Sequence, residues 1–460
     1  MKNLIVSGIS LCLLQSSNSF SIVPSFKPHA LTRSSTSSRF RTEIGPTKQV
    51  IADLTDENVA LRNELIRKDA IIEGLLSTLQ ATAMTTQVDA IHHVTPLTDL
   101  VNVAKEACDA VTPMLQAFYE KIAENKDGGS AKLKNDATYF TIADGIVQHM
   151  FIEHLLSGGK FAQIVGEEDE SEINITTKPY MVDDLVVPDE FNGIIETTLS
   201  KLKALAKKID DTAHRQLTVF VDPIDGTREF ATGHGEYVTI LLGFNDPTGH
   251  PVAGMMYRPL TEPCYWAGGA ASEDCKLGLL DMAETPHPKG MLVTDGKVSP
   301  FLSQLIDELG YERINSVASG NRAMMLLEGK GGAYIRDTGG FAKWDTSAAN
   351  AVLEAYGGCM AKLPAFLEDR TLESYTHLKT TKNLDFNPNQ VHLTLSNAKD
   401  KSQWMKGVDV LVTDVTTIKE YSCCQGLVAL DKECMDDLPA IHDAMLKVKS
   451  EGLWSKPVFT

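Results

Sequence analysis

The sequence predicts an α+β half followed by an α/β half, with a helical extension at the N-terminus. Three observations support this fold class. Strand-like apolar runs lie close together at 217–222, 237–244 and 252–257. Strands alternate with helices beyond residue 290. Upstream of both halves, residues 49–85 carry a heptad pattern.

Residues 1–48 form a predicted targeting leader. Lys2 precedes the apolar run LIVSGISLCLL, and no acidic residue occurs before Glu43. A run this short is typical of a signal peptide and is too short to span a bilayer comfortably. The layout resembles the two-part plastid leaders of algae with complex plastids, which predicts a plastid protein with no membrane anchor in its mature form. The alternative is secretion or residence in the endomembrane system.

Residues 49–85 are predicted to form a charged helix. Its seam alternates spacings of four and three, which is typical of a short coiled coil: Leu54, Asn58, Leu61, Leu65, Lys68, Ile72, Leu75 and Leu79. This pattern predicts a homodimer formed through residues 49–83. The alternative is an amphipathic helix that lies on its own domain.

The globular region is predicted to divide at the Pro/Gly-rich segment 284–290. The N-terminal half, 90–285, begins with apolar periodicity that predicts helices at 97–123 and 139–157. A short strand ending in acids, FAQIVGEEDE, then leads into a polar insertion with a helix near 191–208. In the C-terminal half, 286–460, the strands MLVT, RINSV and GAYIR alternate with helices predicted at 299–309, 320–329 and 345–356. Residues 364–390 are predicted to have no regular secondary structure.

Composition excludes several classes of function. With 460 residues and a formal net charge of −18, the chain lacks the basic character that non-specific nucleic-acid binding requires. Its eight cysteines include no C-x-x-C pair, so we expect neither a zinc site nor a disulfide framework. A small phosphorylated substrate remains compatible with the charge, because a bound cation can reverse the local field.

The stretch LTVFVDPIDGTREF places two carboxylates, Asp222 and Asp225, at the end of a strand. Pro223 cannot continue a central ladder, and Gly226-Thr227 can open a helix whose N–H groups would cradle a phosphate. Either aspartate alone is more simply a turn residue or a helix N-cap. Two unpaired carboxylates beside an anion require a cation between them.

Two further acidic positions have the same character. Glu167-Glu168 lie where the predicted strand 161–165 ends, behind Gly166, and Asp345 precedes a predicted helix in KWDTSAANAVLEAYGG. Each is individually explained by a solvated turn or an N-cap. If these acids converge with the aspartates of the strand end, their desolvation must be offset by cations. Oxygen ligands without Cys or His favour Mg²⁺.

The motifs GEED, DPIDGT and WDTSAA, in this order, resemble the lithium-sensitive, magnesium-dependent phosphatases of the inositol monophosphatase superfamily. The resemblance covers about residues 95–425. It implies the layered αβαβα fold shared with fructose bisphosphatase, a predominantly antiparallel sheet in the first half, and a site at the junction of the halves. The segments FTIADGIVQHM and SQWMKGVDVLV look most like inositol polyphosphate 1-phosphatase. DPIDGTREF and ASGNRAMMLLEGKGGAYI look equally like 3'(2'),5'-bisphosphate nucleotidases.

The resemblance also implies roles for individual residues around two or three Mg²⁺ ions. The implied metal ligands are Glu167, Asp222, the carbonyl of Ile224, Asp225 and Asp345. Gly226 and Thr227 would hold the scissile phosphate through their amides, and Thr227 and Glu167 would help to activate water. The segment ASGNR would line the leaving-group side, which makes substrate candidates of Ser319, Gly320, Asn321 and Arg322.

One position departs from the family pattern. An aspartate that helps to polarise water is expected six residues before Asp144, but Thr138 stands there, and Asp136 could replace it only if the backbone shifts.

From the resemblance as a whole, we expect a phosphatase that cleaves an inositol polyphosphate at its 1-position. The alternative substrate is 3'-phosphoadenosine 5'-phosphate. The alternative of another class is a catalytically impaired binding or scaffold protein.

Overall fold

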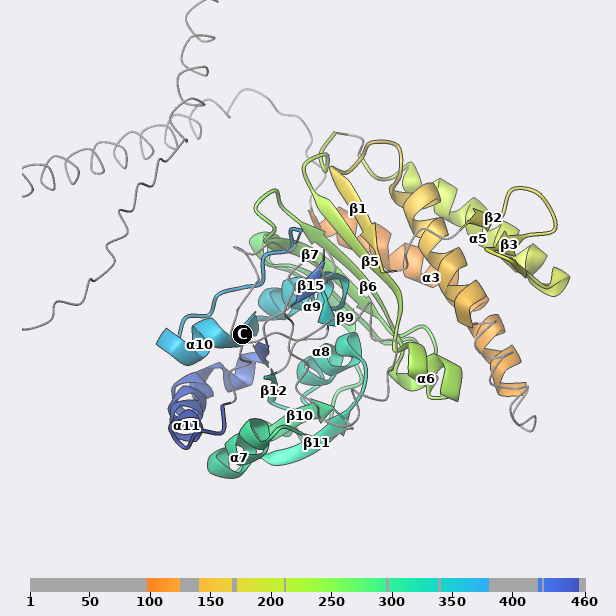
Figure 1. Ribbon diagram of the computed structural model, residues 1–460. Coiled ribbons are helices and arrows are strands. Elements are labelled where there is room, and N and C mark those ends of the chain that lie inside the picture. Colours follow the sequence, from red (N-terminus) through yellow and green to blue (C-terminus); the bar gives the residue numbers. More distant parts are fainter. Residues whose placement is uncertain are drawn as a thin grey trace, which may run out of the picture. The chain divides into compact units, whose positions relative to one another are not determined.

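The computed structural model describes residues 97–124, 140–167, 172–210, 212–294, 298–337, 341–379, 421–423 and 426–454 (Figure 1). All of them belong to one compact unit, His92–Thr460. The predicted leader, the predicted heptad helix and Asp136 lie outside the described residues. Among the helices that the structure describes, none combines the length and the apolar character that a membrane crossing requires.

The first half is built on a six-stranded sheet in the order β1-β5-β6-β7-β8-β9. Only β1 and β5 run parallel, so the predicted, predominantly antiparallel sheet is confirmed. Its strands are β1 (Gln163–Gly166), β5 (Thr218–Asp225), β6 (Thr239–Asn245), β7 (Pro251–Tyr257), β8 (Trp266–Ala270) and β9 (Cys275–Leu279). Strand β6 is buried along its whole length, which explains its nearly continuous apolar run.

Strands β8 and β9 were not among the predicted strands. The β8 sequence WAGGA has little β propensity, because two of its five residues are glycine. The glycines serve packing instead. A Cβ added at Gly269 would lie 2.5 Å from the Cβ of Ala355 on a neighbouring helix, so only glycine permits this close approach.

Helices cover both faces of this sheet (Figure 1). On one face lie α3 (Leu97–Glu124), α5 (Asn192–Ala206) and a helical segment that begins at Phe140 and ends as the π-helix η2 (Met150–Leu156). On the other face lie α8 (Ser319–Leu327) and α9 (Lys343–Tyr356), whose apolar side chains pack with Leu241 and Met256 of β6 and β7.

The second half contains a five-stranded mixed sheet in the order β11-β10-β12-β16-β14. Its strands are β10 (Gly290–Thr294), β11 (Glu312–Ser316), β12 (Ala333–Arg336), β14 (Cys359–Lys362) and β16 (Leu427–Leu430). One face packs on α8 and α9, and the other packs on α7 (Pro300–Leu309), α10 (Leu363–Asp369) and α11 (Leu438–Ser450). The layers therefore alternate αβαβα, as the resemblance implies. Helix α10 corrects the prediction that 364–390 begins as irregular chain.

The remaining elements are short. The insertion forms a small sheet, and a two-stranded pair lies beside the start of α9. These strands are β2 (Ile173–Asn174), β3 (Met181–Val182), β4 (Leu185–Val186), β13 (Phe341–Ala342) and β15 (Ser422–Cys423). The short helices are η3 (Asp189–Phe191), α6 (Thr227–Thr232), η4 (Gly235–Tyr237), η5 (Ala271–Glu273) and η8 (Lys432–Asp437).

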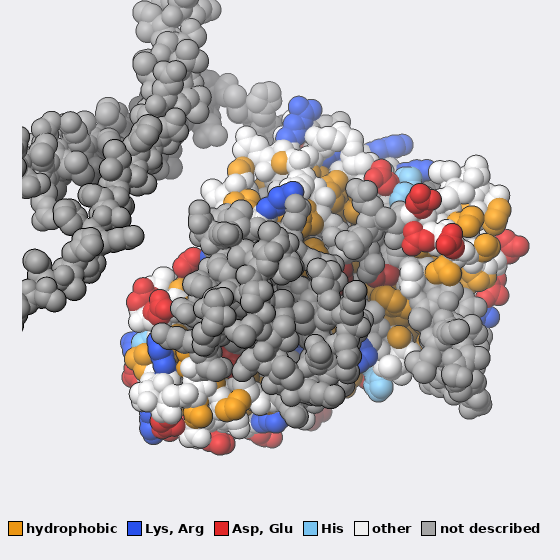
Figure 2. All heavy atoms as spheres, in the orientation of Figure 1, with side chains coloured by type: hydrophobic (Ala, Val, Ile, Leu, Met, Phe, Trp, Pro, Cys, Tyr) orange, Lys and Arg blue, Asp and Glu red, His pale blue; other side chains and the backbone are white. Residues whose placement is uncertain are grey.

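The surface carries mixed charge. On the face shown in Figure 2, the described Lys and Arg side chains are scattered among Asp and Glu and form no continuous basic patch. This distribution agrees with the net charge of −18.

Candidate metal centre

The carboxylates of Asp222, Asp225 and Asp345 come together in the structure. The two strand residues end β5, Asp345 lies in the first turn of α9, and one oxygen of each lies within 4.8 Å of the others. Residues three apart in a regular strand point to opposite faces. Here the pairing of β5 with β6 shifts register between Asp222 and Asp225, across Pro223 and Ile224, which allows both carboxylates to meet. The predicted convergence of these three acids is therefore observed.

Asp225 is held firmly by three donors. The hydroxyl of Thr239 and the backbone N–H of Gly320 each donate to Oδ2 at 2.7 Å, and the backbone N–H of Ser319 donates to Oδ1 at 3.1 Å. Burial raises the pKa of the Asp225 carboxyl, and these hydrogen bonds, together with the charge of Arg322, oppose the shift. The side chain is consequently fixed in place with donors that favour its anionic form.

Asp222 has the opposite environment. It is 1% exposed, and neither carboxylate oxygen accepts a hydrogen bond from a donor among the described residues. Burial raises its pKa well above the ordinary value, and repulsion from neighbouring carboxylates adds to the shift; these belong to Glu167, Asp225 and Asp345. Glu167 follows β1 and is positioned by its backbone N–H, which donates to the carbonyl of Val221 at 3.1 Å. The fourth predicted carboxylate therefore also lies beside Asp222.

Asp345 is held by the backbone of its own helix start. The N–H of Ala342, the residue before α9, donates to Oδ2 at 2.6 Å, which is an N-terminal capping bond. Burial and then the charge of Asp225 raise the pKa of Asp345 to about 7, while Arg336 and Arg322 act in the opposite direction. The simple N-cap explanation is therefore wrong in position: the N-cap is Ala342, and Asp345 is the third residue of the helix, where one of its oxygens accepts the N-cap N–H. This bond leaves the proximity to the other aspartates unexplained.

The donor set fits a hard divalent cation. It consists of carboxylate oxygens without Cys or His, and one of the buried carboxylates, that of Asp222, has no partner among the described donors. A buried anion without a partner is strongly unfavourable unless a positive charge neutralises it. Oxygen ligands of this kind are those that Mg²⁺ prefers. The cluster can therefore hold a divalent metal such as Mg²⁺.

The helix start predicted at Gly226-Thr227 is present in the turn after β5. Gly226 has φ +100°, in the left-handed region that favours glycine, and α6 begins at Thr227. A Cβ at Gly226 would lie 3.3 Å from the Cβ of Ala318, so space is also restricted. The phosphate-holding role of Gly226 and Thr227 and the ligand role of the Ile224 carbonyl stay predictions. Glu168 and Asp136 lie outside the described residues.

The segment ASGNR lies at the cluster, but its contacts differ from the expected ones. The amides of Ser319 and Gly320 are directed at Asp225 rather than at open space. Asn321 is 2% exposed and Arg322 is 5% exposed. The Arg322 guanidinium donates to the hydroxyl and carbonyl of Ser316. Direct contact of either buried side chain with a substrate would require an exchange of bonds inside the protein.

Two contributors to the site are not predictable from the sequence. Thr239 lies in a predicted strand, and in the structure it pairs with Asp225 across the β5–β6 ladder and donates a hydrogen bond to it. Ala318, before α8, has φ +58° and ψ 144°, which is strained for a residue with a side chain. A Thr in a predicted neighbouring strand is a weak signal without the register, and the strain has no signal in the sequence.

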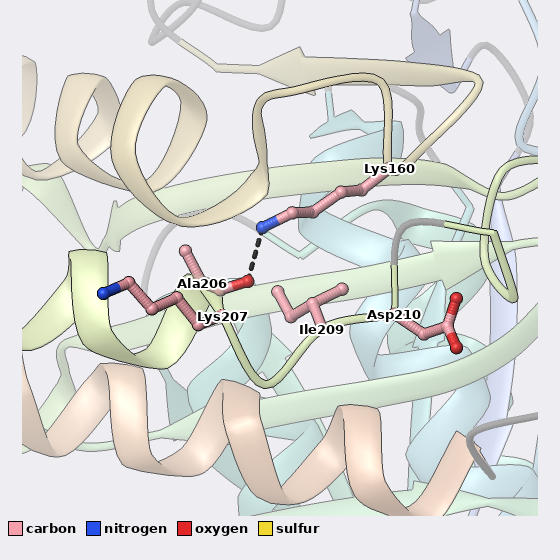
Figure 3. A pocket seen from close by; sticks show the side chains of 5 residues that line it. All are labelled: Lys160, Ala206, Lys207, Ile209 and Asp210. Carbon is pink, nitrogen blue, oxygen red and sulfur yellow. Dashed lines mark hydrogen bonds between the residues drawn. The ribbon is translucent and has the colours of Figure 1, made fainter.

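A separate depression lies away from these acids. Its volume is about 620 Å³, and it is lined by Lys160, Ala206, Lys207, Ile209 and Asp210 (Figure 3). The Lys160 amino group donates to the carbonyl of Ala206 at the C-terminal end of α5, where a cation is favourable. The carboxylates of the cluster do not line it, so it is not the candidate active site.

Comparisons with known proteins agree with this geometry. A family model described as the inositol monophosphatase family matches residues 97–375. The 3'(2'),5'-bisphosphate nucleotidase 1 of Mus musculus is 30% identical over 229 residues, which cover 47% of this chain and 69% of the relative. The protein of the same name from Homo sapiens is 26% identical over 273 residues, which cover 56% and 84%.

Among solved structures, inositol monophosphatase II of Staphylococcus aureus MSSA476 superposes with a TM-score of 0.42 and 14% identity, covering 76% of this chain and 98% of that one. Similarity at this level adds nothing to the assignment, which rests on the family model and the mammalian relatives. The chain belongs to the inositol monophosphatase family and is a metal-dependent phosphatase.

Proposed function

We propose that the protein is a 3'(2'),5'-bisphosphate nucleotidase that removes the 3'-phosphate from 3'-phosphoadenosine 5'-phosphate. The observation that supports phosphatase activity is the cluster formed by the carboxylates of Asp222, Asp225 and Asp345. The oxygens of Asp222 accept no hydrogen bond from the described donors. The choice of substrate is supported by the relatives from Mus musculus, Homo sapiens and Dictyostelium discoideum, all named as bisphosphate nucleotidases.

This proposal reverses the order of the two substrates expected from the motifs. An inositol polyphosphate cleaved at its 1-position came first there, on the basis of segments such as FTIADGIVQHM and SQWMKGVDVLV. The second of these segments lies outside the described residues. The named relatives favour the nucleotide, so the inositol polyphosphate becomes the second substrate to be tested.

We propose that two or three Mg²⁺ ions bind between Glu167, Asp222, Asp225, Asp345 and the carbonyl of Ile224. Such ions lower the pKa of water and offset the charge that develops on the oxygens of a phosphoryl group. The residues of the chain would position the metal ligands, the phosphate and the attacking water. Thr239 and two backbone amides keep Asp225 in place. The amides of Gly226 and Thr227 hold the phosphate, and the Thr227 hydroxyl and Glu167 orient the attacking water.

The test is phosphate release by the purified protein with 3'-phosphoadenosine 5'-phosphate or inositol 1,4-bisphosphate, each with Mg²⁺ and with EDTA. We expect Mg²⁺-dependent release, at least a tenfold higher kcat/KM for the nucleotide, and inhibition by lithium. A tenfold preference for the inositol compound would overturn the substrate. Asp222→Asn should abolish release in every case. Absence of release from all candidates by the wild-type protein would favour the binding or scaffold alternative.

We also propose that residues 1–48 direct the protein to a plastid. A fluorescent reporter fused to this segment and expressed in an alga with a complex plastid should accumulate in that organelle. Accumulation in the endomembrane system would support the secretory alternative, and cytosolic fluorescence would contradict both.

A further inference from the structure

A charge network with a buried core of Arg258 and Glu328 lies beside α8 and has no part in the proposed chemistry. Arg258 directly follows β7 and is 4% exposed, and Glu328, the C-cap of α8, is 0% exposed. One nitrogen of the Arg258 guanidinium donates to Glu328, and another donates to the side-chain oxygen of Asn321 at 2.8 Å. Lys330 lies 3.0 Å from the same glutamate and 2.6 Å from Asp281, so the four charges balance.

The geometry explains why the cation is an arginine. Asn321 and Glu328 are seven residues apart, so their side chains lie on the same face of α8, one above the other. A planar guanidinium can contact both at once through two of its nitrogens, whereas an ammonium is a single point of charge. Arg258 therefore clamps α8 at both ends to the chain that leaves β7.

The clamp continues into the turn that supports Asp225. The side-chain amide of Asn321 donates to the carbonyl of Val317 at 3.0 Å, directly before the strained residue Ala318. A backbone conformation of this kind persists only where surrounding contacts impose it. The next two residues, Ser319 and Gly320, present their N–H groups to Asp225.

Helix α8 packs tightly against strand β6 at Gly320. A Cβ added at Gly320 would lie 2.3 Å from Oγ1 of Thr239 and 2.6 Å from the side chain of Leu241, both on β6. The helix start is thus pressed against the strand that also supplies a hydroxyl donor to Asp225. A small displacement of α8 would lengthen two of the three hydrogen bonds that hold this carboxylate.

We propose that Arg258 is a positioning residue for the metal centre, which acts through Asn321 and the α8 turn to hold Asp225 in the orientation that binds the metal. This inference rests on the proposed metal site but not on the proposed substrate. It assigns a function to a residue that lies outside the three family motifs and was given no role from the sequence.

The test is the affinity of the substrate-free protein for Mg²⁺, measured by calorimetry. Arg258→Lys keeps a cation opposite Glu328 but cannot also reach Asn321, and Asn321→Leu removes the same link from the other side. Groups that orient metal ligands typically contribute 10–100-fold in metal affinity. We expect each variant to raise the Mg²⁺ dissociation constant at least tenfold, and the double variant to add little because both changes break one chain of contacts.

Lys362→Met is the matched control. Lys362 is 3% exposed and pairs with the half-exposed Glu373 at 2.6 Å, so its loss also breaks the ion pair of a buried cation, but it lies on β14 outside the clamp. The control should melt at a lower temperature and bind Mg²⁺ like the wild type. In turnover, saturating Mg²⁺ should restore most of kcat to Arg258→Lys.

Two results would overturn the inference in distinguishable ways. If the wild type binds Mg²⁺ and both clamp variants bind it within twofold of the same affinity, the clamp serves stability alone and the metal site stands. If the wild type itself binds no Mg²⁺, the metal site and the clamp fail together.

Discussion

Replacing Asp345 by asparagine should make the metal-free protein more stable while it destroys the metal site. The pKa of Asp345 is raised to about 7 from an ordinary 3.8, chiefly by burial. A difference of about 3 pH units corresponds to about 4 kcal/mol of unfavourable free energy for the ionised group in the folded protein at pH 8. Asparagine keeps an oxygen for the N–H of Ala342 and removes the charge.

The assay is urea unfolding at pH 8, in EDTA and again in excess Mg²⁺. In EDTA, Asp345→Asn should increase the free energy of unfolding by up to about 4 kcal/mol. In Mg²⁺ the wild type should gain stability, because the ion binds only the folded state, and the variant should gain much less. Phosphate release by the variant should fall at least a hundredfold.

Asp246→Asn is the control for this experiment. Asp246 accepts hydrogen bonds from the turn between β6 and β7, at Thr248 and His250, and is outside the acid cluster. Its replacement should bring no gain in EDTA and should leave the Mg²⁺ effect intact. If Asp345→Asn is no more stable than the wild type without metal, burial and the neighbouring Asp225 do not disfavour the charge of Asp345 as the structure indicates, and the reasoning fails.

Three further predictions concern other parts of the chain. Gly320→Ala should lower the free energy of unfolding by about 1–3 kcal/mol, since the added Cβ would meet Thr239 at 2.3 Å; unchanged thermal unfolding would contradict the packing. Full burial lowers the pKa of His377 to about 3 from 6.5, so the unfolded chain binds more protons below pH 6.5. Stability should fall by about 2 kcal/mol between pH 7.5 and pH 5 from this group, and His377→Asn should lose that part of the slope in urea titrations. Deleting residues 49–83 should turn a dimer into a monomer by light scattering, and an unchanged number of chains per particle would refute the predicted coiled coil.

The sequence was most informative where chemistry and local structure coincide. The helix start at Thr227 could be predicted, because Gly226-Thr227 follows an apolar run and a proline. The predicted end of the strand at Asp222 was wrong: β5 continues through Pro223 to Asp225, because a register shift against β6 accommodates the proline. The spacing of the acidic motifs left open whether Asp345 approaches the strand end, and the resemblance of the three motifs to the phosphatase superfamily implied that it does. Each signal that succeeded is local or belongs to a motif, so it survives without knowledge of the packing.

The environment of each carboxylate could not be predicted in the same way. Which residue stands opposite Asp225 depends on the register of β5 and β6, and that register shifts at the motif itself. The donors from Ser319 and Gly320 depend on where α8 lies, which Arg258 controls from another strand end. Strand β8 was missed for a related reason, because its glycines are selected by the approach of α9 rather than by strand propensity.

Asp225 and Asp222 have different environments, and these environments suit different roles in metal binding. Asp225 receives three hydrogen bonds, which satisfy part of its capacity and set its direction before any ion arrives. Asp222 receives none from the described donors and is surrounded by other carboxylates, so a cation is the partner that can satisfy it. Had donors been provided to Asp222 as well, the metal-free protein would be more stable, but an arriving ion would have to displace them. The same side chain, Asp222, therefore lowers the stability of the metal-free protein and favours the binding of a metal ion.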